Sequence, residues 1–452
     1  MSGAPETSVM PKPRASWREG FAVYLQRRVL IVLLLGFSSG LPLALSGSTL
    51  LVWMRESGVD LGTIGLFALV GTPYTLKFIW APLVDALHVP FFTRAFGRRR
   101  GWLLFSQLLL IVSILLLALT DPARSPLFVA LGALLVAAMS STQDIVVDAF
   151  RVESLPESEQ AAGMASYVAA YRIGMLVSTA GALFLVSAFE GTGIARSQAW
   201  MWGYVAMAAL VLIGTATALA ATEPEQSARA EAATGDESAF TRVIHAAVGA
   251  LSEFLARKDA WAALTFVVLY KFTDAFSGTM TAPFVIDLGF SRNDYAAIVK
   301  GVGLAATLIG GFAGGYVARR YSLAASLWIG GVLQAVANLS FSWLAFVGVN
   351  QWALAFAITA ENFTSAIGTV IFVAYLSALC RNPLHTATQY ALLTALAAVG
   401  RTYLSSGAGY VAKATGWPLF FAICVVVAVP SLILLAWLQR RGHFEGLGTV
   451  RV

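Results

Sequence analysis

The chain has 452 residues, of which 58% are hydrophobic and only 12% are charged, and its formal net charge is +6. A soluble globule of this length needs more polar residues to cover its surface, so the composition excludes a soluble protein and predicts a polytopic membrane protein. In such a protein the excess of positive charge reflects membrane topology, and we expect no nucleic-acid partner.

Apolar stretches of about 20 residues, the length that spans a bilayer, recur along the whole chain. The twelve stretches occupy residues 29–54, 61–84, 102–120, 126–150, 161–189, 198–221, 260–286, 293–318, 323–348, 351–379, 386–412 and 416–438. A polar segment separates the first six from the last six. We therefore predict an all-α polytopic membrane protein whose twelve transmembrane helices form two pseudo-symmetric six-helix bundles.

This pattern also predicts how the chain is divided. The expected parts are a cytoplasmic tail (1–28), an N-terminal bundle (29–221), a cytoplasmic linker (222–258), a C-terminal bundle (259–440) and a second cytoplasmic tail (441–452). Within the linker, residues 240–255 carry apolar side chains at helical spacing. This spacing predicts an amphipathic helix on the inner leaflet of the membrane.

Lysine and arginine are distributed unevenly between the two sides of the predicted helices. With a cytoplasmic N-terminus, 20 of the 30 basic residues fall on the cytoplasmic side, and the five on the other side are Arg55, Arg124, Arg196, Arg292 and Lys413. The remaining five lie within the spans and are Lys77, Arg172, Lys271, Lys300 and Arg401. By the positive-inside rule, both termini are expected in the cytoplasm.

The first predicted span is interrupted by Gly36, Gly40, Pro42 and Gly47. A broken helix frees backbone groups that only protein or cavity water can satisfy, so such breaks often border a substrate site. Glycines also allow two helices to pack closely. Both interpretations remain open for Gly40, which we include among the candidate substrate-binding residues.

Charged residues flank the loop between the second and third spans. Lys77 and Asp85 lie at the end of the second span, and Arg98, Arg99 and Arg100 precede the third. An acid at one helix end and a basic cluster at the next can form a charge latch that exists in only one conformation. We take all five as candidate gating residues, although a topology anchor explains the arginines equally well.

Two carboxylates lie inside the fourth predicted span. Asp144 and Asp148 are four residues apart, so they share one face of a helix. An acid in the hydrocarbon region costs about 2.5 kcal/mol or more, so this face must line a bundle interior or a wet cavity. Arg172, midway through the fifth span, is the expected partner, and a static ion pair between the two helices is the alternative to a transport role.

The second half of the chain repeats the buried charges. In the seventh span, Lys271 and Asp274 are three residues apart and are expected to neutralise each other. Glu361 and Asn362 lie within the tenth span, and Arg401 lies within the eleventh. For the glycines of the eighth span we expect close helix packing; these are Gly310, Gly311, Gly314 and Gly315.

Ionisable groups at depth in both halves predict a transport pathway. The sequence has no Gly-rich loop ending in Gly-Lys-Ser/Thr, the motif that binds ATP phosphates. We therefore predict a secondary transporter that needs no cofactor and no metal, with the proton as coupling ion. The candidate proton carriers are Asp144, Asp148, Asp274 and Glu361. A membrane-embedded enzyme such as a glycolipid transferase is the alternative from another class, and it would have its acids clustered at one membrane surface.

Several motifs together resemble one known family. They are Gly-Leu-Pro-Leu-Ala-Leu (40–45), Lys-Phe-Ile-Trp-Ala-Pro (77–82), Gly-Arg-Arg-Arg-Gly-Trp (97–102), Gln-Asp-Ile-Val-Val-Asp-Ala (143–149), Tyr-Arg-Ile-Gly-Met-Leu-Val-Ser (171–178), Leu-Tyr-Lys-Phe-Thr-Asp-Ala-Phe (269–276) and Ala-Thr-Gln-Tyr-Ala-Leu-Leu (387–393). They resemble the AmpG family of muropeptide permeases, which belong to the major facilitator superfamily and lie in the inner membrane of Gram-negative bacteria. The resemblance implies proton symport of 1,6-anhydromuropeptides into the cytoplasm for peptidoglycan recycling, and support of β-lactamase induction and antibiotic resistance.

A disaccharide that carries a short peptide offers hydroxyls, amides and carboxylates. For the amides and hydroxyls we expect Gln143, Asn362 and Gln389. For the sugar faces we expect Tyr171, Tyr270 and Tyr390. For the carboxylates we expect Arg172, Lys271 and Arg401. We expect a monomer, and the alternative cargo is another anion, such as an acyl-CoA or a drug.

Overall fold

The structure is a computed structural model that describes residues 23–224, 255, 259–379, 386–445 and 447. Within these residues every regular element is a helix. The predicted amphipathic helix falls almost entirely on residues outside the described part of the chain. The fold class predicted from the sequence is confirmed: each of the twelve apolar stretches coincides with one helix or with a run of consecutive helical segments.

The first six stretches correspond to helices that contact one another. They are α2 (Arg27–Leu45) with α3 (Ser48–Glu56); α4 (Leu61–Leu66), η2 (Phe67–Gly71), α5 (Thr72–Leu76), η3 (Lys77–Ile79) and α6 (Ala81–Ala86); α8 (Arg98–Ala118); α9 (Pro126–Ser154); α10 (Glu157–Leu176), η4 (Val177–Gly181) and α11 (Ala182–Gly191); and α12 (Arg196–Ala220). The short helix α7 (Phe92–Phe96) lies in the loop before α8. We call this group the first bundle.

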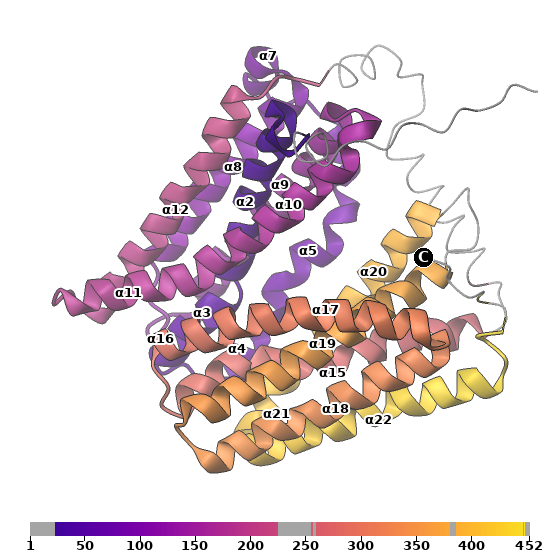
Figure 1. Cartoon of the computed structure of the whole chain (residues 1–452). Coiled ribbons are helices and arrows are strands. Elements are labelled where there is room, and N and C mark those ends of the chain that lie inside the picture. The colour runs from indigo at the N-terminus through magenta and orange to yellow at the C-terminus, as the bar shows by residue number, and fades with distance from the viewer. Residues whose placement is uncertain (1–22, 225–254, 256–258, 380–385, 446, 448–452) are drawn as a thin grey trace, which may run out of the picture.

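The last six stretches form a second bundle. Its helices are α15 (Ala260–Asp287); α16 (Arg292–Asp294), η5 (Tyr295–Val302) and α17 (Gly303–Arg320); α18 (Leu323–Val347); α19 (Gln351–Leu379); α20 (Thr386–Tyr403), η6 (Leu404–Gly407) and α21 (Ala408–Thr415); and α22 (Trp417–Arg440). Figure 1 shows the two bundles side by side, with the first in indigo to pink and the second in salmon to yellow.

Ten helices in the described part of the chain are long and apolar enough to cross a membrane. The two predicted spans outside that set are α15 and the α20–α21 run. Both carry ionisable residues away from their ends, namely Lys271 and Asp274 in the middle of α15 and Arg401 near the middle of the α20–α21 run. Because each charge lowers the apolar character of a helix, these two helices depend on their neighbours to shield their polar faces from lipid.

The hydrophobic core is shared between the bundles at one end only. We call the end where α2 begins and α22 ends the terminal face, and the opposite end the distal face. One cluster of buried residues joins both bundles and includes Leu50 and Trp53 of α3 with Phe284 of α15. Two further clusters lie closer to the terminal face, and each is confined to a single bundle. The bundles therefore pack together toward the distal face and separate toward the terminal face, as Figure 1 shows.

The break in the first span lies later than the sequence suggested. Helix α2 continues through Gly40 and Pro42, and the chain leaves helical geometry only at Gly47. A Cβ at Gly40 would overlap the backbone of Tyr171, so this glycine lets α2 and α10 cross closely. The close helix packing expected of Gly40 is confirmed, and its place among the substrate-binding residues stays a prediction.

Two of the four glycines of the eighth span also serve packing. A Cβ at Gly310 or Gly314 would meet the backbone of α19 at Phe363 or Ile367. By contrast, no atom lies within 4 Å of a Cβ built on Gly311 or Gly315. The packing prediction thus holds for one face of α17 and not for the other.

Candidate functional site

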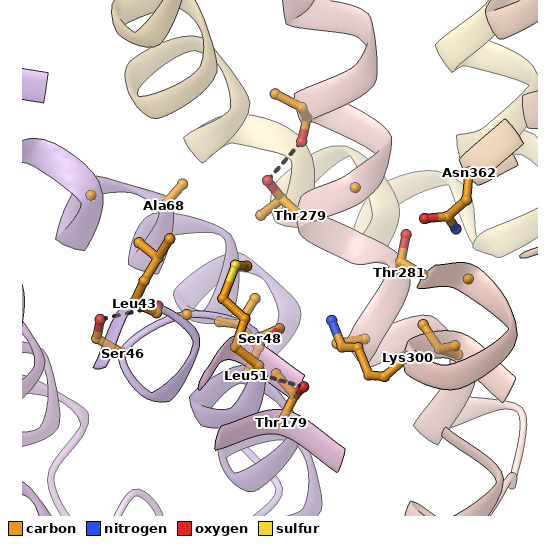
Figure 2. A pocket seen from close by; sticks show the side chains of 18 of the residues that line it. Leu43, Ser46, Ser48, Leu51, Ala68, Thr179, Thr279, Thr281, Lys300 and Asn362 are labelled. Atoms are coloured by element: carbon orange, nitrogen blue, oxygen red, sulfur yellow. Dashed lines mark hydrogen bonds between the residues drawn. The ribbon is translucent and has the colours of Figure 1, made fainter. Parts of the chain in front are cut away.

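A cavity of about 570 Å³ lies between the two bundles. The first bundle contributes the break after α2, with Ser46 and Ser48, and parts of η2, α5 and α10. The second bundle contributes α15, η5, α17, α19 and α20. Figure 2 shows side chains of both bundles facing each other across this space. Its volume lies within the range of about 300–1,000 Å³ that is common for small-molecule sites.

Five ionisable side chains line this cavity. They are Arg172 of α10, Asp274 of α15, Lys300 of η5, Glu361 of α19 and Arg401 of α20. All except Lys300 were candidate site residues from the sequence, and Asn362 lines the cavity as predicted. Lys300 had been recognised only as a charge within a span. Groups that are far apart in the sequence thus meet in one chamber between the bundles.

Lys271 and Asp274 form the predicted ion pair. The ammonium of Lys271 lies 2.6 Å from Asp274 Oδ2 and also donates a hydrogen bond of 3.0 Å to Thr369. The Ser365 hydroxyl donates to the other oxygen of Asp274 at 2.8 Å. Lys271 does not belong to the cavity lining. The prediction that Lys271 binds a cargo carboxylate is therefore not supported, because its charge is already compensated within the second bundle.

Glu361 and Asn362 are adjacent in sequence and bonded to each other. The Asn362 amide donates to Glu361 Oε2 at 2.9 Å and to the carbonyl of Ile358 at 3.0 Å. The Thr307 hydroxyl donates to Asn362 Oδ1 at 3.2 Å. Lys271 and Lys300 act on Glu361 electrostatically, but among the described residues no cation forms an ion pair with it within 4 Å.

Asp144 and Gln143 lie inside the first bundle and outside this cavity. Asp144 is 6% exposed and Gln143 is fully buried. Asp144 Oδ1 and Gln143 Oε1 accept no hydrogen bond from the described residues, and Gln143 donates only a long one, of 3.5 Å, to Ser39. The predicted contact of Gln143 with cargo is therefore wrong for this conformer.

The expected partner of the two acids in α9 was also wrong. Arg172 lines the cavity and forms no ion pair with Asp144 or Asp148. Instead, Lys77 interacts electrostatically with both acids, and Asp148 lies 3.8 Å from Arg151 one turn along the same helix. Sequence spacing placed the two acids on one face correctly, but it could not show which way Arg172 points.

The three predicted tyrosines have different outcomes. Tyr270 is 3% exposed, donates to the carbonyl of Leu327 at 3.1 Å and stacks on Phe372 at 5.5 Å. It is a core residue, so the prediction that it packs on sugar is wrong. Tyr171 is half-buried beside Tyr167 and does not line the cavity. The side chains of Tyr390 and Gln389 lie outside the described part of the structure. Tyr74 and Tyr295, which the sequence did not single out, line the cavity.

Arg99 and Arg100, in the first turn of α8, are bound to nearby groups. Arg99 Nη2 lies 2.5 Å from Glu153 at the end of α9. The backbone amides of Arg99 and Arg100 donate to the Glu223 carboxylate at 2.7 and 3.0 Å, so this acid caps the N-terminus of α8. The Arg100 guanidinium donates to the carbonyls of Ala218 and Leu219 at 2.9 and 2.8 Å. The side chain of their predicted partner Asp85 lies outside the described part.

Ion pairs between the bundles lie at the distal face, where the sequence predicted none. Arg292 pairs with Glu56 at 2.6 Å and with Glu190 at 2.8 Å. It lies over Trp200 at 5.6 Å, and the Trp200 indole donates to Glu56 at 3.1 Å. The Arg292 side chain is only 6% exposed, so the cluster is largely shielded from water.

Two further ion pairs join the bundles at this face. Arg55 of α3 pairs with Asp287 at the end of α15, and the Trp417 indole donates to Asp287 at 3.1 Å. Lys413 of α21 lies 3.4 Å from Asp60, which precedes α4. The only sequence signal for these pairs was the presence of opposite charges in loops that the topology places on one side.

Comparisons with known proteins agree with this architecture. A family model described as Major Facilitator Superfamily matches residues 32–405. The anhydromuropeptide permease of Escherichia coli (strain K12) is 40% identical over 415 residues, which cover 91% of this chain and 80% of that protein. The putative transporter AmpG 4 of Rickettsia felis is 34% identical over 419 residues, or 93% of this chain and 98% of that protein. A D-xylose-proton symporter has a similar fold, with a TM-score of 0.66, 13% identity and coverage of 91% and 97%.

Proposed function

Because the chain belongs to the Major Facilitator Superfamily and is a transporter rather than an enzyme, we propose that it imports 1,6-anhydromuropeptides by proton symport. These cargoes are N-acetylglucosaminyl-anhydro-N-acetylmuramyl peptides, and their import returns cell-wall fragments to the cytoplasm. The single observation that supports this proposal most strongly is the cavity between the bundles, found in a chain with 40% identity to an anhydromuropeptide permease.

The lining of the cavity suits such a cargo. Arg172 and Arg401 reach it from opposite bundles and offer guanidinium groups to carboxylates. Asn362 and the hydroxyls of Ser46 and Ser48 offer hydrogen bonds to amides and sugar hydroxyls. Tyr74 offers a ring face to a sugar. The site therefore combines the three kinds of group that a peptide-bearing disaccharide requires.

We propose the proton as coupling ion and four acids as its carriers: Asp144, Asp148, Asp274 and Glu361. Glu361 has the strongest support, because it lines the cavity and no cation pairs with it among the described residues. A net-negative cargo that moves inward works against the membrane potential, at about 2.3 kcal/mol per charge per 100 mV. Net uptake therefore requires more protons than negative charges carried.

We also propose the orientation in the inner membrane. Both termini lie in the cytoplasm, which follows from the positive-inside rule. The distal face is then periplasmic and closed, and the cavity communicates with the cytoplasm. The N-terminal bundle spans 29–221 and the C-terminal bundle 259–440, with the linker 222–258 on the cytoplasmic side, and the protein acts as a monomer. We propose Lys77, Asp85 and Arg98 to Arg100 as gating residues at the terminal face.

The experiment is uptake of labelled anhydromuropeptide into proteoliposomes with an imposed pH gradient. The native chain should accumulate the cargo when the outside is acidic, and an uncoupler should abolish the accumulation. Glu361→Gln should still let the cargo move down its own concentration gradient, but it should lose proton-driven accumulation. Uptake of an acyl-CoA or a drug without uptake of muropeptide would overturn the assignment of the cargo. Accumulation by Glu361→Gln at the native level would remove Glu361 as a proton carrier.

A further inference from the structure

We propose that Lys300 is a cargo-binding residue that recognises a carboxylate on the peptide part of the cargo. This inference rests on the proposed function and deepens it. Lys300 follows the start of the span Arg292–Ala318 by eight residues, and its side chain lines the cavity. Figure 2 shows its ammonium group pointing into the space between the side chains of the two bundles.

The local backbone explains this orientation. Residues Tyr295–Val302 form the π-helical segment η5. A π-helix is wider than an α-helix and changes the direction of the side chains along it, and such segments occur frequently at functional sites. Segment η5 contacts η4, the π-helical segment Val177–Gly181 of the first bundle. Lys300 is therefore carried by an unusual turn at the place where the two bundles meet.

The two lysines of the second bundle have different partners. The Lys271 ammonium has a carboxylate at 2.6 Å and a hydroxyl at 3.0 Å. The Lys300 ammonium lies 5.4 Å from the ring centroid of Tyr295, and among the residues that the structure describes no carboxylate lies within 4 Å of it. An ammonium at membrane depth is costly unless it meets an anion or water. Lys300 thus has a charge still available for a ligand, whereas Lys271 does not.

The charge balance of the cavity favours an anionic ligand. Its lining holds three cations and two carboxylates. Lys271, from outside the lining, already compensates Asp274. Three cations therefore face one acid, Glu361, and the surplus of positive charge attracts a cargo carboxylate. Lys300 is a compact point charge with three donors on a flexible stem, so it can follow a mobile peptide carboxylate.

The test compares two forms of one cargo in the same proteoliposomes. One is the anhydromuropeptide with free peptide carboxylates, and the other has those carboxylates converted to amides. The native chain should take up the free acid with a lower half-saturating concentration than the amide. Lys300→Gln should raise that concentration about tenfold for the free acid, which corresponds to about 1.4 kcal/mol, and leave the amide unchanged. Lys300→Arg should keep the preference.

A control separates this role from general damage. Lys271→Gln leaves Asp274 buried without its cation, so it should impair uptake of both cargoes alike. If Lys300→Gln also impairs both alike, or keeps the native preference for the free acid, the proposal is overturned. If the native chain takes up neither cargo, it is the proposed function that fails.

A second measurement uses the native chain and does not depend on a variant. An anhydromuropeptide whose peptide carboxylate is activated as a succinimidyl ester acylates a lysine that lies beside it. The ammonium first loses a proton to water, and the free amine then attacks the ester carbonyl, forming an amide and releasing N-hydroxysuccinimide. Mass spectrometry should locate the adduct on Lys300, and unmodified cargo in excess should suppress it. An adduct confined to other lysines would overturn the proposal.

Discussion

The two faces of the protein use their charges differently. At the distal face, Arg292, Arg55 and Lys413 each form an ion pair that joins one bundle to the other. At the terminal face, Arg99 and Arg100 in the first turn of α8 bind groups of their own bundle, as Arg99 does Glu153. Contacts within a bundle persist when the two bundles move as rigid bodies, whereas contacts between bundles must break. The distal ion pairs therefore help to select this conformer, and the terminal contacts stabilise the first bundle in every conformer.

We expect the largest effect at the distal face from Arg292→Gln. The substitution removes the cation that both Glu56 and Glu190 share, in a cluster where the Arg292 side chain is 6% exposed. We expect the ratio of the two conformers to shift by at least about tenfold toward the one with an open distal face, or about 1.4 kcal/mol. The measurement is the distance between spin labels at Thr192 and Val349, in a background where Cys380 and Cys424 are replaced.

Arg196→Gln is the matched control for that experiment. Arg196 also pairs with Glu190, at 3.1 Å, but it belongs to the same bundle and its side chain is 61% exposed. Its loss should leave the distance distribution unchanged. If Arg196→Gln shifts the distance distribution as much as Arg292→Gln does, the effect does not depend on whether the ion pair joins the two bundles.

The pair of Arg55 and Asp287 allows a charge exchange. Arg55→Asp places two acids together, so the population of the conformer with an open distal face should rise several-fold. The double variant with Asp287→Arg restores opposite charges and should recover most of the native distribution. Recovery should be incomplete, because the Trp417 indole loses its acceptor and Arg55 no longer donates to the carbonyl of Val59. A double variant as open as the single one would show that this ion pair does not hold the face closed.

Lys413 and Asp60 form the weakest link at the distal face. Both side chains are about half exposed, so Lys413→Gln should change the conformer ratio by less than about twofold. The Thr63 hydroxyl donates to the Asp60 carboxylate at 2.5 Å and lowers the pKa of Asp60 below its ordinary value. A lowered pKa keeps the acid ionised, so its contribution is complete above about pH 4 and is lost only on further acidification.

This pH dependence can be checked with the same spin labels. Acidification from about pH 8 to about pH 5 covers the range in which most proteins are stable, and it should not release the Asp60 pair. The difference in conformer ratio between the native chain and Lys413→Gln should therefore stay constant over that range. If that difference in conformer ratio disappears between about pH 8 and about pH 5, the lowered pKa of Asp60 is contradicted.

Glu153→Gln tests the terminal side of the comparison. It removes the carboxylate of Glu153, which binds the Arg99 side chain at a site where that side chain is 5% exposed, so the first bundle should lose about 1.5–3 kcal/mol of stability. Because the pair lies within one bundle, the spin-label distances should not move. Thermal unfolding in detergent measures the first effect, and the label pair measures the second. A changed distance distribution would show that Glu153 has a partner in the second bundle in the other conformer.

Most of the fold could be predicted from the sequence. The length of an apolar stretch is a local property, and only a helix satisfies every backbone group within the bilayer. Finer features depended on packing. The break of the first span lies at Gly47, because Gly40 is held in helical geometry against the backbone of Tyr171. The two spans outside the set of ten apolar helices, α15 and the α20–α21 run, were still found because apolar residues flank their charges.

The candidate site was predicted in part. Charges inside the spans marked Arg172, Asp274, Glu361 and Arg401 correctly as residues of a central chamber. Lys271 and Lys300 are both lysines within a predicted span, and only Lys271 has an acid, Asp274, one helical turn away in the sequence. One is neutralised by Asp274 and the other extends into the cavity. The i,i+3 spacing predicted the partner of Lys271, but no local spacing could show that the Lys300 side chain faces a cavity between the bundles.

The many membrane crossings and the buried charges of both halves could be read from the amino-acid order, because hydrophobic length and the cost of a buried charge are properties of each segment alone. Which charges face the cavity and which join the bundles became clear only from the packing of the helices. Those outcomes depend on distances of a few ångströms between helices that are remote in the chain. Asp144 and Arg172 lie on consecutive spans and remain apart, whereas Glu56 and Arg292, 236 positions apart, form an ion pair at the distal face.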